Sequence, residues 1–288
     1  MGKIFLITAQ KGGVGKTTIN VHCAFQTAVR CKAKTLLIEL DPQCNATNDA
    51  LFPEEEDVIF KLPGADKAKA SLLWSENPEI KPLTNQYGID CIWGDGEINS
   101  FPKALAGSDK VQKGDVDELI TDVVYRQMGF FKSNIAKLKA QYDYIFIDTP
   151  PSFLGLPMMS AISVADELVG ILMIDKFSVS VNESFLDNVT TIMDALDNPD
   201  LNIRGFVINM FQYKSRPKAL LEKWKKNYGD DLFICDEIPY AEWIKDTVND
   251  GVPIWKNADN QSKKRAVMRY MRLFASLDLV PLRSAVNV

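Results

Sequence analysis

A short segment rich in glycine and lysine, KGGVGKTT, follows the apolar run Ile4–Ile7 near the start of the chain. A strand, then a glycine-rich loop, then a helix is the arrangement that binds phosphate, because backbone N–H groups and the helix N-terminus face the anion. In that arrangement Lys16 reaches the β- and γ-phosphates of a nucleotide, and Thr17 supplies a hydroxyl for Mg²⁺. The other residues expected to contact the phosphates are Gly12, Gly13, Val14, Gly15 and Thr18.

The loop departs from the ordinary phosphate-binding pattern at two positions. The ordinary pattern is G-x-x-x-x-G-K-[ST], and its first glycine would fall at position 10, where this chain has Gln10. Lys11 also adds a second lysine, although Lys16 alone would serve to bind the phosphate. The loop residues by themselves leave the purpose of Lys11 open.

The apolar runs around the loop predict an α/β fold. Short β-branched runs that are apolar on both faces are typical of buried strands in parallel sheets. Helical patterns lie between most of them, which implies right-handed crossovers and a doubly wound, mainly parallel sheet flanked by helices. The predicted strands are Ile4–Thr8, Thr35–Leu40, Ile89–Trp93, Tyr144–Asp148, Glu167–Ile174 and Gly205–Met210. The predicted helices are Lys16–Arg30, Asp117–Gln141, Val179–Leu196, Lys218–Tyr228 and Gln261–Leu277.

The least regular part of the chain is residues 48–114. It contains several prolines, the acidic cluster Glu54–Asp57 and the polar stretch Ala106–Gly114. We expect an irregular insertion that carries one strand, with a mobile loop near Gly107–Gly114. The acidic cluster is more typical of a solvated loop than of a binding site. Because no repeat or linker divides the chain, we predict a single domain over residues 1–288.

Composition excludes several classes of protein. Hydrophobic residues make up 46% and charged residues 25% of the chain, the balance of a soluble globular protein. No apolar run approaches the roughly 20 residues of a membrane-spanning helix, and Ile4–Thr8 is too short for a signal peptide, so we expect a cytoplasmic protein. Five scattered cysteines without CxxC argue against a disulfide framework or a zinc site. The single histidine, His22, argues against histidine-based catalysis, and the net charge of −5 against a generally basic DNA-coating protein.

Asp148 ends a predicted buried strand, at the sheet edge where ligands of α/β folds collect. A carboxylate at that position could hold a Mg²⁺-bound water. A helix N-cap is a poor alternative, because Pro150 and Pro151 follow. Thr17 and Asp148 are therefore the predicted metal-site residues.

Several segments together resemble the ParA/MinD family of deviant Walker ATPases, and in particular the ParA partition proteins. KGGVGKTT looks like the family's phosphate loop, TLLIELDPQCNAT at Thr35–Thr47 like its second motif, and YDYIFIDTPPS at Tyr142–Ser152 like its Walker B strand. Residues 198–211, 238–253 and 261–277 follow the ParA C-terminal half. The resemblance covers nearly the whole chain and implies the P-loop NTPase fold of the deviant Walker type.

The resemblance gives Lys11 a role. In this family the extra lysine reaches across a nucleotide-sandwich homodimer to the phosphates bound by the other subunit. The γ-phosphate charge is then shared by two cations, one from each chain. ATP bridges the two subunits, and its hydrolysis to ADP loosens the dimer, which makes a switch.

Other site residues are also implied by the resemblance. Asp41 matches the family aspartate that orients the attacking water, so the predicted catalytic residues are Lys11, Lys16 and Asp41; a turn-forming Asp-Pro is the alternative for Asp41. Glu39 stands where the family commonly has another Asp, and its longer side chain leaves its role open. Asn209 and the backbone near Pro239 are candidates for contacting the adenine.

A basic run at residues 214–226 is the candidate DNA-binding surface. ParA proteins usually bind non-specific DNA as ATP dimers through C-terminal basic residues, which here would include Lys214, Arg216 and Lys218. A solvated helix face is the alternative. The segment YAEWIKDTVNDG after Pro239 also lacks the arginines that often occupy this region in the family.

The resemblance implies an ATPase that is weak alone, is stimulated by a partner, and requires Mg²⁺. It would drive plasmid or chromosome partition with a ParB-like centromere-binding adaptor and associate with the nucleoid when ATP-bound. A positioner of another intracellular cargo would use the same motifs. A MinD-like membrane-associated ATPase is a further alternative, but it would carry a terminal basic amphipathic helix, whereas this chain ends LVPLRSAVNV. We therefore expect no membrane partner.

Overall fold

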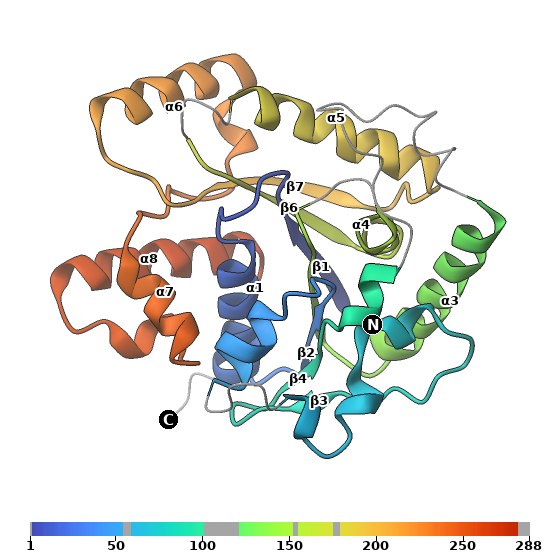
Figure 1. The fold of residues 1–288 in the computed structure, drawn as a ribbon. Helices are drawn as coiled ribbons and strands as arrows, with labels where there is room; N and C mark the ends of the chain where they lie inside the picture. Colours follow the sequence, from blue (N-terminus) through green and yellow to red (C-terminus); the bar gives the residue numbers. More distant parts are fainter. Residues whose placement is uncertain (1, 54–58, 101–120, 152–154, 175–178, 282–288) are drawn as a thin grey trace.

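A seven-stranded sheet forms the centre of the protein in the computed structural model, which describes residues 2–53, 59–100, 121–151, 155–174 and 179–281 (Figure 1). The strands are β1 (Lys3–Thr8), β2 (Thr35–Glu39), β3 (Leu83–Thr84), β4 (Ile89–Ile92), β5 (Tyr144–Asp148), β6 (Glu167–Leu172) and β7 (Asn202–Ile208). Their order is β3-β4-β2-β5-β1-β6-β7. All neighbours pair in parallel except β3 and β4. The prediction of a doubly wound, mainly parallel sheet is confirmed.

Helices cover both faces of this sheet. Phe5 and Ile7 of β1 belong to a hydrophobic cluster with α1, α7 and α8, whereas Ile4 and Leu6 belong to a cluster with α3, α4, α5 and α6. Figure 1 shows α1, α7 and α8 on one side of the sheet and α3, α4 and α5 on the other. Because successive strand residues point to opposite faces, burial on both faces requires the continuous apolar runs seen in the sequence. The helices are α1 (Lys16–Phe25), α3 (Asp122–Lys139), α4 (Leu156–Ile162), α5 (Val179–Ala195), α6 (Ser215–Tyr228), α7 (Glu242–Asn249) and α8 (Gln261–Ser276).

The segment predicted to be an irregular insertion is more ordered than the sequence suggested. It contributes two strands to the sheet, β3 and β4, where one was predicted. β4 pairs in parallel with β2, while the two-residue β3 pairs antiparallel with β4. Between them and β2 the chain forms short helical turns, the first of which is the π-helical turn Ala46–Leu51. The acidic cluster Glu54–Asp57 and the predicted mobile loop 107–114 lie outside the described residues.

The helix predicted to reach Arg30 changes its hydrogen-bond pattern partway. It is α-helical to Phe25 and continues as a π-helical turn over Gln26–Arg30. Helix α3 begins at Asp122, capped by the Thr121 hydroxyl. Residues 117–120 of the predicted helix lie outside the described part of the chain. Helices α4 and α7 were not predicted.

His22 lies in the packing of α1 against α7. It is fully buried, and its Nε2 lies 3.1 Å from the Thr247 hydroxyl oxygen. Burial lowers the pKa of His22 to about 3, so the imidazole is neutral at physiological pH. The only histidine therefore joins two helices. Among the described residues, no helix combines the length and apolarity needed to cross a membrane.

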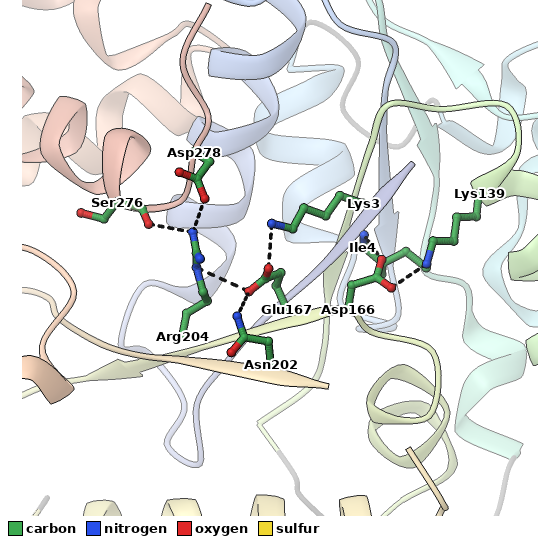
Figure 2. A network of polar contacts seen from close by, with 9 residues as sticks. All are labelled: Lys3, Ile4, Lys139, Asp166, Glu167, Asn202, Arg204, Ser276 and Asp278. Atoms are coloured by element: carbon green, nitrogen blue, oxygen red, sulfur yellow. Dashed lines mark hydrogen bonds and ion pairs between the residues drawn. The ribbon is translucent and has the colours of Figure 1, made fainter. Parts of the chain in front are cut away.

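A network of ion pairs joins the starting ends of β1, β6 and β7 to the end of α8 (Figure 2). At its centre, the Glu167 carboxylate lies 2.7 Å from Lys3 Nζ and 3.4 Å from Arg204 Nε, and accepts a 2.8 Å hydrogen bond from Asn202. Arg204 also donates to the Asp278 carboxylate and to the Ser276 carbonyl. This network joins the C-terminal end of α8 to the sheet edge opposite the phosphate loop.

Candidate nucleotide-binding site

The phosphate loop connects β1 to α1 at the C-terminal edge of the sheet. Gly13 (φ +73°) and Gly15 (φ +88°) adopt left-handed backbone conformations that favour glycine. A Cβ added at Gly15 would also overlap the amide nitrogen of Asn209, whereas one at Gly13 would meet nothing within 4 Å. The N-cap residue of α1 is Gly15, which has no side chain to cap the helix, so the N–H groups of the first turn suit an anion.

Lys16, the first residue of α1, is almost completely buried, with 7% of its surface exposed. Burial lowers the pKa of its ammonium group, while attraction to Asp148 and Asp41 opposes that shift. A desolvated ammonium gains from a nearby anion far more than an exposed one does. Lys16 therefore suits a phosphate group that replaces the lost water.

Thr17 and Asp148 meet where α1 crosses the end of β5. The Thr17 hydroxyl donates to Asp148 Oδ2 at 2.7 Å, and Asn20 Nδ2 donates to Asp148 Oδ1 at 2.9 Å. Burial is the main cause that raises the pKa of Asp148 to about 6; the Thr17 hydrogen bond and the Lys16 charge oppose it. This carboxylate consequently lacks a cationic partner strong enough to offset its burial.

The Thr17 and Asp148 oxygens fit the way proteins bind Mg²⁺. This ion takes oxygen ligands and usually keeps several waters, with one or two carboxylates and the phosphates of a substrate. In the part of the chain that is described, no cluster of three or more His, Cys, Asp or Glu residues forms a cation site. One hydroxyl and one buried carboxylate beside a phosphate loop are thus a donor set for Mg²⁺ bound together with a nucleotide.

Asp41 lies in a turn that follows β2 at the same edge of the sheet. The carboxylate is half-buried and accepts a 3.0 Å hydrogen bond from the Gln43 N–H. Its backbone carbonyl accepts from the Cys44 N–H at 3.1 Å and lies against Gly94, where a Cβ would overlap it. The turn is thus held close to the end of β4.

Asn209 follows β7 and hydrogen-bonds to the phosphate loop. It is buried, and its Nδ2 donates to the Val14 carbonyl at 2.8 Å. Val14 is also buried. Pro239 lies beside the same strand end, because it forms a parallel bridge with Phe211.

These elements enclose a cavity of about 550 Å³. The predicted site residues that line it are Gly12, Gly13, Gly15, Lys16, Thr17, Thr18, Asp41, Asn209 and Pro239. Lining residues that were not predicted include Asn45, Asp49, Met210, Tyr240, Glu242, Lys245 and Asn249. Most of these lie on or just before α7. The helical spacing of its buried residues, Ile244, Thr247 and Val248, was the available signal for this wall.

Six predicted residues do not line the cavity: Lys11, Val14, Asp148, Lys214, Arg216 and Lys218. Lys11 is half-buried in the loop but does not line the cavity. Lys214, Arg216 and Lys218 are exposed at the start of α6 and also lie outside the cavity. The structure therefore separates the α6 cations from the phosphate loop.

Sequence comparison identifies the family. The AAA_31 family model, described as an AAA domain, matches residues 2–203. The chain is 30% identical over 262 residues to the sporulation initiation inhibitor protein Soj of Bacillus subtilis (strain 168), a match that covers 88% of this chain and 90% of that protein.

Two solved structures are similar to this fold. A plasmid partition protein from Borrelia burgdorferi matches with a TM-score of 0.63 and 23% identity over 86% of this chain and 95% of that one. A variant of McdA from Cyanothece in complex with ATP matches with a TM-score of 0.71 and 17% identity over 98% of each chain. These likenesses agree with the doubly wound sheet. The chain therefore belongs to the AAA_31 family and is a ParA-type member of the ParA/MinD group of P-loop partition ATPases.

Proposed function

We propose that the chain is an ATP-driven switch that dimerises on binding ATP, hydrolyses it, and drives DNA partition. The observation that carries this proposal is a cavity at the N-terminus of α1, lined by buried Lys16 and by Thr17, whose hydroxyl donates to Asp148. The similar McdA structure was solved with ATP, which supports ATP as the nucleotide. The names of two similar proteins, a sporulation initiation inhibitor protein from Bacillus and a plasmid partition protein from Borrelia, support the role in DNA partition.

In this proposal the predicted site residues have separate tasks. The amides of the loop and Lys16 hold the phosphates, and Asn209 with the backbone near Pro239 contacts the adenine. Thr17 and Asp148 hold Mg²⁺, which neutralises phosphate charge when bound. Asp41 lines the same cavity and orients the attacking water.

Lys11 serves the second subunit in this scheme. Lys11 lies on the phosphate loop but does not line the cavity, so Lys16 is the lysine that contacts the nucleotide bound by the same subunit. Reaching the γ-phosphate of a partner chain would make ATP part of a homodimer interface. The exposed α6 cations then bind non-specific DNA, a ParB-like adaptor stimulates hydrolysis, and the ATP form associates with the nucleoid.

The proposal is tested with purified protein by measuring phosphate release and ATP binding. Lys16→Ala should abolish nucleotide binding, because the β/γ charge loses its nearest cation. Asp41→Ala should keep ATP binding and lose turnover, because it removes orientation of the water alone. Tight ATP binding by Lys16→Ala in calorimetry would contradict the assignment of the loop.

A mixing experiment tests the role of Lys11 across the dimer. Lys11→Ala and Asp41→Ala chains should each be inactive alone. In a mixed dimer, the nucleotide on the Lys11→Ala chain has its own Asp41 and receives Lys11 from the partner. Partial recovery of phosphate release supports the trans role. No recovery, despite mixed dimers detected by crosslinking, would count against it.

A further inference from the structure

Glu39 is a buried carboxylate at the cavity end of β2, and the site described above gives it no task. It has no exposed surface and is the register partner of Asp148 in the β2–β5 ladder. Register partners on neighbouring strands point to the same face of a sheet. Asp148 hydrogen-bonds to Thr17 and Asn20 of α1. Glu39 makes different contacts.

Both Glu39 oxygens are occupied by the π-helical turn Ala46–Leu51. Oε1 accepts from the Ala46 N–H at 2.8 Å, and Oε2 accepts from the Thr47 N–H at 3.0 Å and from the Thr47 hydroxyl. A carboxylate that accepts backbone N–H bonds at the start of a helical turn satisfies donors that have no partner within the turn. Glu39 therefore ties the start of this turn to the end of β2.

The residues between these two points form the turn that carries Asp41. At its beginning, the Leu40 N–H donates to the Asp148 carbonyl at 2.8 Å. In its middle, the Cys44 thiol donates to the Gly94 carbonyl, and the Asp41 backbone packs against Gly94. At its end, the bonds from Ala46 and Thr47 to Glu39 close the loop. Asp41 is thus held between two anchors that both start from the sheet.

We propose that Glu39 is a positioning residue for ATP hydrolysis, whose carboxylate holds the Asp41 turn in place through the amides of Ala46 and Thr47. This inference rests on the proposed function, because it assigns Glu39 to the Asp41 step of that reaction. The length of the side chain matters. An aspartate would be shorter by about 1.5 Å, one carbon–carbon bond, which would stretch the contacts of 2.8 and 3.0 Å beyond hydrogen-bonding distance.

The experiment compares Glu39→Asp and Glu39→Gln with wild type by phosphate release and by ATP affinity. Glu39→Gln keeps the length but presents an NH₂ group to one of two N–H donors. Because a misplacement of about 1 Å can cost about 100-fold in rate, we expect kcat to fall about 10- to 100-fold. ATP affinity should stay within about threefold, because neither variant touches the phosphate loop.

Two matched controls separate positioning from general stability. Thr47→Val removes the hydroxyl donor and leaves both backbone amides on Glu39, so it should keep most of the turnover. Asp166→Asn changes a carboxylate that accepts the Ile4 N–H at 2.8 Å at the opposite edge of the sheet. It should lower the melting temperature without changing kcat.

Hydrogen exchange supplies a readout that does not depend on activity. In the wild type, the amides of Ala46 and Thr47 should exchange slowly, and both Glu39 variants should speed their exchange while Asp166→Asn does not. Rapid exchange of these two amides in the wild type would overturn the inference, even if no Glu39 variant folds. Wild-type kcat in Glu39→Asp or Glu39→Gln would overturn it too. If the proposed function itself is wrong, the wild type will lack ATP turnover or Asp41→Ala will retain it.

Discussion

Replacing Asp148 by Asn should stabilise the nucleotide-free protein while removing its Mg²⁺-dependent function. Asp148 is buried, with 1% of its surface exposed, and its oxygens accept from Thr17 and Asn20 at 2.7 and 2.9 Å. An asparagine oxygen can still accept from Asn20, and its NH₂ group can donate to the Thr17 hydroxyl after that hydroxyl rotates. The substitution therefore removes a buried charge and keeps both hydrogen bonds.

The size of the stabilisation expected for Asp148→Asn follows from the pKa of Asp148. Burial raises this pKa from 3.8 to about 6, so the folded protein holds a proton over a pH range in which the unfolded chain has lost it. The wild-type free energy of unfolding should therefore fall as pH rises from about 4 to about 6. Full ionisation costs about 3 kcal/mol, and about half of that at pH 5. The Asp148 charge also helps burial to raise the pKa of Glu39 to about 8, so its removal acts in the same direction.

Urea unfolding of the nucleotide-free proteins measures this difference. Asp148→Asn should be more stable than wild type by about 3 kcal/mol at pH 8 and by about 1.5 kcal/mol at pH 5. With ATP and Mg²⁺ at saturating concentration, the wild type should gain more stability from ligand binding than Asp148→Asn, which lacks one of the two proposed Mg²⁺-site residues. As a control, Asp166→Asn removes a carboxylate that pairs with Lys139 and should gain nothing. Equal or lower stability of Asp148→Asn at pH 8 would refute the reasoning.

Three further predictions concern other parts of the molecule. Gly15→Ala should lower the melting temperature of the nucleotide-free protein more than Gly13→Ala, because both positions have positive φ but only a Cβ at Gly15 overlaps Asn209; equal losses would contradict this. Arg204→Ala should lower the free energy of unfolding by about 1–3 kcal/mol in urea titrations, because it leaves a mostly buried carboxylate with fewer partners, whereas breaking an exposed surface ion pair should change little. Charge reversal of the three α6 cations should weaken ATP-dependent DNA binding and flatten its salt slope by up to about 0.9 per lost phosphate contact; an unchanged slope would place the DNA site elsewhere.

Six of the seven strands were predictable, because most of their residues are buried on both faces of the sheet; the two-residue β3 is not buried and was not predicted. Tyr144–Asp148 was predicted with the bounds that the structure shows, since apolar residues fill the strand up to Asp148. β7 begins three residues before the predicted Gly205. Two of these three residues, Asn202 and Arg204, are polar and take part in the ion-pair network, so the start of the strand lacks a continuous apolar run.

The phosphate loop was also predictable, because its residues are contiguous and their chemistry requires that spacing. The part of the cavity wall that α7 forms was not predictable from the sequence. Helix α7 has eight residues, and its N-cap, Ala241, has no side-chain cap to mark the start. The hydrogen bond between Asn209 and Val14, for example, joins residues 195 positions apart, and a local sequence pattern cannot indicate such a contact. The sequence likewise placed a carboxylate at position 39 without indicating the two backbone amides that it would meet.

The two outer strands of the sheet have a consequence for how the protein behaves in a crowded cell. An exposed strand edge offers unpaired N–H and C=O groups on which another chain can add a strand and aggregate. Here β3 has only two residues and follows Pro82, which has no N–H to offer. At the other side, Phe206 and Phe211 of the β7 region form bridges with Phe233 and Pro239, so the returning chain covers part of that edge. Both borders of the sheet thus resist recruitment of foreign strands.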